Sequence, residues 1–219
     1  WKEILSQLFT VKVMNKMNLY LTKRLLKYTF LLCLTFLILG CAKSSKPVEY
    51  YMLDASVGID NNQTLKGDEG PMIGLGPIRL PEYLDRFQMV VAVSENKYKL
   101  IDGHRWAEKL DQNISLALFK TLPSQLGTDR MIRYPWPQRP GVDFQVKIDI
   151  LELNVDQDGQ SQLVAQWSIK SKDKTILNKR STFTAQASTT DIDKMVQAQS
   201  ECLTQLGQEI VANLKPLLK

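Results

Sequence analysis

The stretch VDFQVKIDILELNV, residues 142–155, has the clearest strand pattern in the chain. Its apolar side chains occupy even positions up to Ile150 and then odd positions from Leu151 to Val155. Side chains of a strand alternate between its two faces, so one face stays apolar throughout only if an extra residue changes the phase. The stretch therefore predicts a half-buried strand with a β-bulge near Ile150.

The residues that follow predict that this strand returns on itself. The sequence DQDG, residues 156–159, is typical of a turn, and apolar side chains alternate again over residues 163–169. After a polar turn, KSKDK, residues 176–187 read as a third strand. This part of the chain is therefore expected to form a long antiparallel hairpin extended by one more strand.

Shorter strands are predicted earlier in the chain. The candidates are residues 50–55, 72–80, 88–94, 98–102 and 131–136, and residues 56–70 between the first two read as a loop. Residues 81–86 are expected to form one helical turn. Residues 98–102 alternate only partly between apolar and polar, which is compatible with an edge position.

Two long amphipathic helices are predicted. The first is expected to begin near His104, with Trp106 on its apolar face, and to be kinked or ended at Pro123. The second is expected to be capped near Thr190 or Asp191 and to end at Pro216. Its predicted buried stripe is Ile192, Met195, Val196, Gln199, Leu203, Leu206, Ile210 and Leu214.

A sheet with one apolar face and two amphipathic helices bury their apolar faces against each other, so the predicted fold is a single α/β (α+β) domain. Its expected architecture is a mixed, mostly antiparallel β-sheet covered by two long helices.

The stretch LILGCAKSS, residues 37–45, follows the features of an export signal. Lys23, Arg24 and Lys27 form a basic cluster, and residues 29–39 form an uncharged apolar run before Gly40. A membrane-spanning helix needs about 20 apolar residues, so this run is short for an anchor. The segment resembles a bacterial lipobox, which implies that Cys41 is acylated and that the chain is cut just before it. The alternative interpretation is an uncleaved N-terminal anchor.

The sequence therefore divides into four parts. Residues 1–16 are interpreted as an upstream extension because the chain begins with Trp1 and Met17 opens a signal of ordinary length, with Met14 as the other candidate start. Residues 17–40 form the signal peptide, 41–49 a polar tether and 50–219 the domain. Eight extended tether residues reach at most about 27 Å, which keeps the domain near the membrane.

The net charge of +5 of the whole sequence comes from the residues before Cys41. Six basic residues and one acidic residue precede Cys41, and subtracting them from 28 and 23 leaves 22 of each. A neutral mature chain without basic clusters disfavours nucleic-acid binding. Of the three cysteines, only Cys202 remains after Cys33 is removed and Cys41 is lipidated, and it is interpreted as a buried free thiol.

No catalytic or cofactor motif is found in the sequence. His104 is the only histidine, and its neighbours Asp102 and Arg105 favour a helix-capping role with a surface imidazole over acid–base chemistry. One histidine and one cysteine do not supply a zinc site. GLGPIR, residues 74–79, lacks the spacing of a dinucleotide or phosphate loop. We therefore expect no enzyme activity, metal or cofactor.

Three motifs stand out in the mature chain: PEYLDRFQ at residues 81–88 after Gly76-Pro77, HRWAEKL at 104–110, and YPW at 134–136. They resemble the PqiC/YmbA family of ABC-type transport auxiliary lipoproteins, in which a glycine-proline strand precedes P-x-Y-L-D-R-P-Q, then H-R-W-A-E-P-L, then Y-P-W. The match extends across the mature chain. Phe87 and Lys109 replace prolines of that pattern, which leaves the local loop geometry open.

The resemblance implies a lipoprotein anchored in the outer membrane and facing the periplasm. It would serve an ABC-type or MCE-type system that moves lipids or other hydrophobic molecules between membranes, and so support membrane integrity. Its role would be to dock a periplasmic partner protein, and self-association is also expected. Ala42 after the acylated (palmitate-bearing) cysteine resembles the sorting rule for the outer membrane.

The candidate partner-binding residues are Tyr83, Arg86, Arg105, Trp106 and Trp136, because exposed aromatic and arginine side chains are favoured at interfaces. A structural interpretation competes with this one: Trp106 lies in the core, and an arginine pairs with Asp85 or Glu108. Two other functions stay open, a structural envelope lipoprotein that binds cell wall or assists outer-membrane assembly, and a periplasmic hydrolase.

Lipidation is directly testable. Mass spectrometry of the protein extracted from cells should find a new amino terminus at Cys41 that carries a diacylglycerol thioether. An intact, unmodified amino terminus would contradict this prediction.

Overall fold

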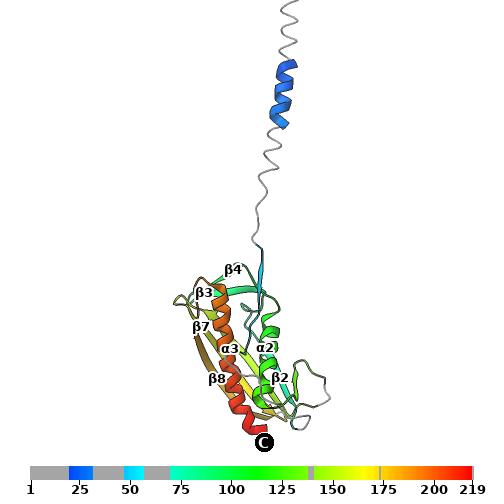
Figure 1. Cartoon of the computed structure of the whole chain (residues 1–219), viewed down its shortest axis with the longest axis vertical. Coiled ribbons are helices and arrows are strands. Elements are labelled where there is room, and N and C mark those ends of the chain that lie inside the picture. The colour runs from blue at the N-terminus through cyan, green and yellow to red at the C-terminus, as the bar shows by residue number, and fades with distance from the viewer. Residues whose placement is uncertain (1–19, 32–46, 57–69, 138–140, 173, 219) are drawn as a thin grey trace, which may run out of the picture. The chain divides into compact units, whose positions relative to one another are not determined.

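The computed structural model describes residues 20–31, 47–56, 70–137, 141–172 and 174–218 (Figure 1). The chain divides between Lys46 and Pro47 into two units. In the first unit, residues 20–31 are helical and their side chains are exposed. No helix within the described ranges combines the length and the apolar character that crossing a membrane requires. The predicted lipidation site, Cys41, and the sorting residue, Ala42, lie outside the described residues.

The second unit is built on a five-stranded sheet with the order β5-β2-β6-β7-β8. β2 pairs in parallel with both β5 and β6, and the β6, β7 and β8 pairings are antiparallel. The strands are β2 (Ile73–Arg79), β5 (Met131–Arg133), β6 (Phe144–Val155), β7 (Gln160–Ser171) and β8 (Lys174–Gln186).

The bulge predicted in the opening stretch is confirmed. Ile150 pairs with Ala165 while Glu152 pairs with the next residue of β7, Val164, so Leu151 is the extra residue of β6. Ile148 and Ile150 before the bulge are fully or almost fully buried, and so is Leu153 after it. The phase change therefore keeps a single apolar face on the core.

A second sheet, of three strands, contains the largest difference from the sequence prediction. It consists of β1 (Glu49–Tyr51), β4 (Lys97–Trp106) and β3 (Gln88–Ser94), in the order β1-β4-β3. The prediction that a helix begins near His104 is wrong, because His104–Trp106 pair in parallel with β1. The edge position suggested for residues 98–102 agrees with the pairing, because β1 reaches only His104–Trp106 of β4 and the earlier residues of β4 pair with β3 alone among the described strands.

The two long helices are present. α2 (Leu110–Leu126) continues past Pro123 and ends at Gly127, whose φ of 77° is the left-handed conformation that glycine adopts readily. α3 (Ile192–Leu214) begins after Asp191, whose side chain accepts a hydrogen bond from the Lys194 amide at 3.2 Å. This confirms the predicted cap. A short 3₁₀ helix, η1 (Lys215–Leu218), follows at Pro216.

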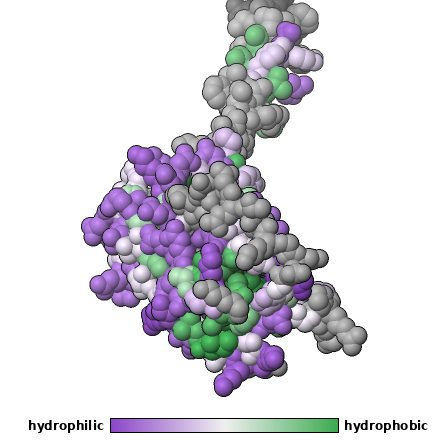
Figure 2. Space-filling model, turned by 60° about the horizontal axis from the view of Figure 1, so that its bottom comes forward, coloured by the Kyte–Doolittle hydropathy of each residue, from purple (hydrophilic) through white to green (hydrophobic). Residues whose placement is uncertain are grey.

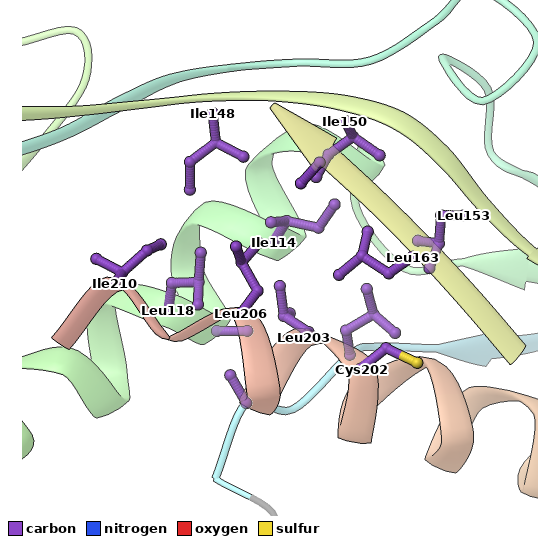
Figure 3. Close-up of a cluster of buried hydrophobic side chains, with 14 of the residues drawn as sticks. Ile114, Leu118, Ile148, Ile150, Leu153, Leu163, Cys202, Leu203, Leu206 and Ile210 are labelled. Carbon is purple, nitrogen blue, oxygen red and sulfur yellow. The ribbon is translucent and has the colours of Figure 1, made fainter. Parts of the chain in front are cut away.

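The core lies between these helices and the five-stranded sheet (Figure 3). Cys202 is 0% exposed, and burial raises the pKa of its thiol to about 11, so the thiol stays protonated at neutral pH. This confirms the predicted buried thiol. The other side chains labelled in Figure 3 are Ile114 and Leu118 of α2, Leu203, Leu206 and Ile210 of α3, and Ile148, Ile150, Leu153 and Leu163 of the sheet.

Because of the bulge, deleting one residue of β6 should destabilise the domain by different amounts at two positions. Deleting Leu151 removes the extra residue and leaves the inward face intact, so we expect a loss of less than about 1.5 kcal/mol in unfolding free energy. Deleting Lys147 instead turns Phe144 and Val146 away from the core, which should cost about 3 kcal/mol or more. Urea unfolding of both variants measures the difference. Equal losses would contradict the role assigned to the bulge.

Candidate partner-binding surface

The segment that leads from the predicted anchor enters the domain beside β4. A Cβ added at Gly103 would lie 4.0 Å from the carbonyl oxygen of Pro47, and the chain then forms β1. The backbone continues the contact beyond β1, because the Ala107 amide donates to the Tyr51 carbonyl at 2.9 Å. The anchor side of the chain is thus built into the small sheet.

Residues 51–56, called the anchor-side segment below, bind both long helices. The Leu53 amide donates to Asn113 Oδ1 of α2 at 2.7 Å, and the Asp54 amide donates to Ser200 Oγ of α3 at 3.1 Å. Leu53 and Ala55 are 5% and 1% exposed. The segment therefore belongs to the core.

The only histidine of the chain lies in a strand, not at a helix start. Tyr51 Oη donates to Glu49 Oε2 at 2.7 Å, and His104 Nδ1 lies 3.1 Å from the same hydroxyl and 3.3 Å from Glu49 Oε2. Burial, then Glu49, raises the pKa of Tyr51 to about 12, so the hydroxyl is protonated at neutral pH. The helix-capping prediction is wrong, because α2 begins after Lys109 without a side-chain cap. These contacts join β1 to β4.

The first motif folds as a turn in which Tyr83 and Arg86 have different environments. The Pro81 carbonyl accepts hydrogen bonds from the Leu84 and Asp85 amides. The Tyr83 ring packs on Tyr98 at 4.9 Å between centroids, and its buried hydroxyl makes no hydrogen bond of normal geometry. Arg86 is exposed. The turn thus presents one cationic side chain and tucks its tyrosine inward.

Arg105 and Trp106 are consecutive strand residues, so they point to opposite sides of the small sheet. Trp106 is 4% exposed and packs in the core, whereas Arg105 is exposed beside Tyr50, its partner in β1. The Trp106 amide donates to the Phe87 carbonyl at 2.8 Å, which places the end of the first motif against the second.

The structural interpretation of these arginines is only half right. Among the residues that the structure describes, no ion pair joins Arg86 or Arg105 to Asp85 or Glu108. Trp106 does lie in the core, as that interpretation expects. Arg86 and Arg105 are therefore exposed and have no ion pair among the described residues, and the same motifs also expose the acidic side chains of Glu82, Asp85 and Glu108.

Trp136 lies on the other sheet, where its ring covers a glycine. A Cβ at Gly74 would lie 2.8 Å from Trp136 Cη2 and 2.9 Å from Val142 Cγ1, closer than real Cβ atoms come. The Tyr134 ring contacts the Trp136 ring edge-on, with 5.5 Å between the ring centroids. Gly76 has a φ of 114°, and a Cβ added there would lie 2.8 Å from Tyr134 Cβ. The glycines of β2 and the Y-P-W motif thus form one packing unit.

The structure brings together two of the five predicted residues. Arg86 and Arg105 lie on neighbouring segments of the small sheet, Tyr83 and Trp106 pack inward, and Trp136 belongs to the other sheet. Sequence reasoning missed the dependence of Trp136 on Gly74, although paired glycines in a strand often mark a close approach. Within the described ranges, no group of three or more His, Cys, Asp or Glu side chains is placed to hold a metal.

Comparison with known families gives one match over most of the folded unit. The model of the family described as ABC-type transport auxiliary lipoprotein component matches residues 51–211. The search of curated protein sequences returned no match. Proteins of this family are named for an auxiliary role in transport and not for an enzyme activity.

Solved structures share the fold at low sequence identity. The crystal structure of an uncharacterized protein aligns with a TM-score of 0.62 and 16% identity, covering 77% of this chain and 99% of that one. Protein XCC0632 from Xanthomonas campestris, of the family DUF330, aligns with a TM-score of 0.62 and 13% identity, covering 78% and 97%. At these identities the likeness concerns the fold alone.

The packing of Trp136 on Gly74 predicts a strong effect of one methyl group. Gly74→Ala should displace the indole and destabilise the domain by about 1–3 kcal/mol, because the added atom overpacks the contact. Gly141→Ala is the matched control, since no atom lies within 4 Å of its Cβ position. Urea unfolding followed by tryptophan fluorescence measures both, and equal stability of the two variants would contradict the packing described.

Tyr83 predicts a specific alkaline effect. Burial, then Tyr98 and Glu152, raises the pKa of Tyr83 to about 12 from an unfolded value of 10.0. The folded state therefore holds this proton longer, and its stabilising effect is present below pH 10 and is lost as pH rises toward 12. Tyr83→Phe should reduce the fall in stability over that range and change neutral-pH stability by less than about 0.5 kcal/mol.

Urea unfolding from pH 9 to pH 11.5 checks this, with Tyr50→Phe, at a position 64% exposed, as control. An alkaline profile of Tyr83→Phe that coincides with that of the parent protein would rule out a buried, perturbed Tyr83.

Proposed function

Since the chain belongs to the family of ABC-type transport auxiliary lipoprotein components, we propose that it is an outer-membrane lipoprotein that docks a periplasmic protein of an ABC-type or MCE-type transport system. The observation that carries the proposal is the family match over residues 51–211, which spans most of the folded unit. The cargo is proposed to be a lipid or another hydrophobic molecule that moves between the two membranes.

The proposed mooring rests on Cys41 and Ala42. One acyl chain binds a bilayer only marginally, at about 0.8 kcal/mol per buried methylene, so the several chains of a bacterial lipoprotein are needed for firm anchoring. Ala42 is proposed to direct the protein to the outer membrane, with the domain on the periplasmic face. The short tether joins a segment that is itself buried in the domain.

The proposed docking surface centres on Arg86 and Arg105. Both are exposed, without an ion pair to another described residue, and held on neighbouring backbone segments by the hydrogen bond between Trp106 and Phe87. Arginine is enriched at interface positions that contribute most to binding. Tyr83 would support this surface by packing beneath it, and Trp136 is proposed as a separate contact on the five-stranded sheet.

Crosslinking in intact cells, followed by purification of the lipidated protein, tests the proposal. MCE-type or ABC-system components should be recovered repeatedly with the parent protein. Arg86→Glu/Arg105→Glu should reduce their recovery strongly, since loss of an interface centre costs about 2 kcal/mol, or about thirtyfold in affinity. Lys120→Glu/Lys194→Glu reverses two exposed charges on the helices and is the matched control.

Recovery of only porins and peptidoglycan would count against a transport role and favour a structural envelope lipoprotein. Equal recovery by the two charge-reversal variants would leave the transport role standing and remove Arg86 and Arg105 from the docking surface.

A further inference from the structure

β8 is a long strand at the edge of the five-stranded sheet. It has 13 residues and pairs with β7 on one side only. Near its end α3 covers this edge, because Gln205 Nε2 donates to the Thr184 carbonyl at 3.3 Å. Over residues 174–182 no backbone partner from another described segment lies outside β8. This stretch is called the open edge below.

An open edge carries unpaired N–H and C=O groups that bind an added strand. In an antiparallel ladder the backbone groups of alternate residues point away from the neighbouring strand. The Thr184 carbonyl is bonded from the α3 side and not by β7, which places the outward-pointing groups of the open edge at residues 178, 180 and 182. The open edge thus offers a ladder of three residues.

The side chains around the open edge are basic, although the mature chain as a whole is neutral. Residues 170–180 contain five basic residues and one acidic residue, Asp173, for a balance of +4. Lys179 is neutralised by Glu209 of α3. The remaining four have no ion pair within the described part of the chain: Lys170, Lys172, Lys174 and Arg180.

Apolar surface lies at the same end of the domain. Figure 1 shows the C-terminus at the end opposite β3 and β4, and Figure 2 shows an apolar patch bordered by hydrophilic surface with that end turned forward. Ile176, in the open edge, is 47% exposed, and Leu217 and Leu218 of η1 are half-buried. A strand added here would gain an apolar contact as well as backbone pairing.

The basic side chains around the open edge determine which kind of strand can pair with it. A second copy of the chain, pairing edge to edge, would bring two basic clusters together, and like charges on paired strands are destabilising. Lysines on an edge strand are a known protection against self-pairing. An extended segment with acidic side chains gains from the same charges. The open edge therefore favours a partner of opposite charge over a second copy.

We propose that the open edge of β8 binds an extended acidic segment of a partner protein by strand addition, with an apolar residue of that segment resting on Ile176. This inference rests on the proposed docking function and adds a second contact site, at the end of the domain opposite the small sheet that carries Arg86 and Arg105. The partner segment is defined by its chemistry: acidic residues alternating with β-branched apolar ones.

The test uses full-length lipidated protein in detergent micelles and two nine-residue peptides, one alternating Glu and Val and the other alternating Lys and Val. Amide hydrogen exchange over residues 174–182 is measured with each. At about ten times its Kd, the Glu–Val peptide should slow exchange of the open edge about tenfold, because a paired amide exchanges only while the peptide is dissociated. The Lys–Val peptide should leave exchange unchanged.

Charge reversal completes the test. Lys174→Glu/Arg180→Glu should abolish the effect of the Glu–Val peptide and allow the Lys–Val peptide to protect the edge. Lys97→Glu/Lys99→Glu, on the small sheet, should behave as the parent protein does.

Failure of both peptides to protect the open edge, or equal protection by both, would overturn the proposal. Protection that rises with protein concentration in the absence of peptide would overturn it in favour of a second copy. Because the peptides report on β8 directly, any of these results leaves the crosslinking test of the transport role unaffected.

Discussion

Two hydrogen bonds tie the anchor side of the chain to the fold. The amides of Leu53 and Asp54 donate to Asn113 of α2 and Ser200 of α3, and the first of these bonds is buried. A buried amide that loses its partner costs about 1–3 kcal/mol, and withdrawal of the segment would also expose Leu53 and empty the site of Ala55. The segment after the tether is therefore a structural part of the helix pair, and the proposed mooring acts on the core itself.

Local patterns were sufficient for most of the large sheet and for α3. The change from even to odd apolar positions at Ile150 specifies the bulge, and Asp191 specifies the helix start, since each depends on neighbours in sequence. The strand at His104–Trp106 could not be found this way. Its parallel partner, β1, lies 55 residues earlier, since Glu49 pairs with His104. Trp106 falls in phase with the apolar positions of α2 because both face the core.

The motifs that identify the family are largely architectural. Trp106 fills the core, Tyr83 packs on Tyr98, and Trp136 lies on a glycine that no other residue replaces without overlap. Among the side chains that they leave exposed are two arginines, Arg86 and Arg105, at the small sheet. The sequence patterns singled out these residues, but they did not separate the packed side chains from the exposed ones. That separation depends on which face of a strand each residue occupies and on contacts between distant segments.

Native-state hydrogen exchange of the Leu53 and Asp54 amides in the full-length protein tests the central claim most directly. If the anchor-side segment is part of the core, both amides should exchange only through global unfolding, with the same free energy and denaturant dependence as buried amides of β6 and β7. Exchange of these two amides with little protection and no dependence on denaturant would show that the segment detaches while the domain stays folded, and would contradict the claim.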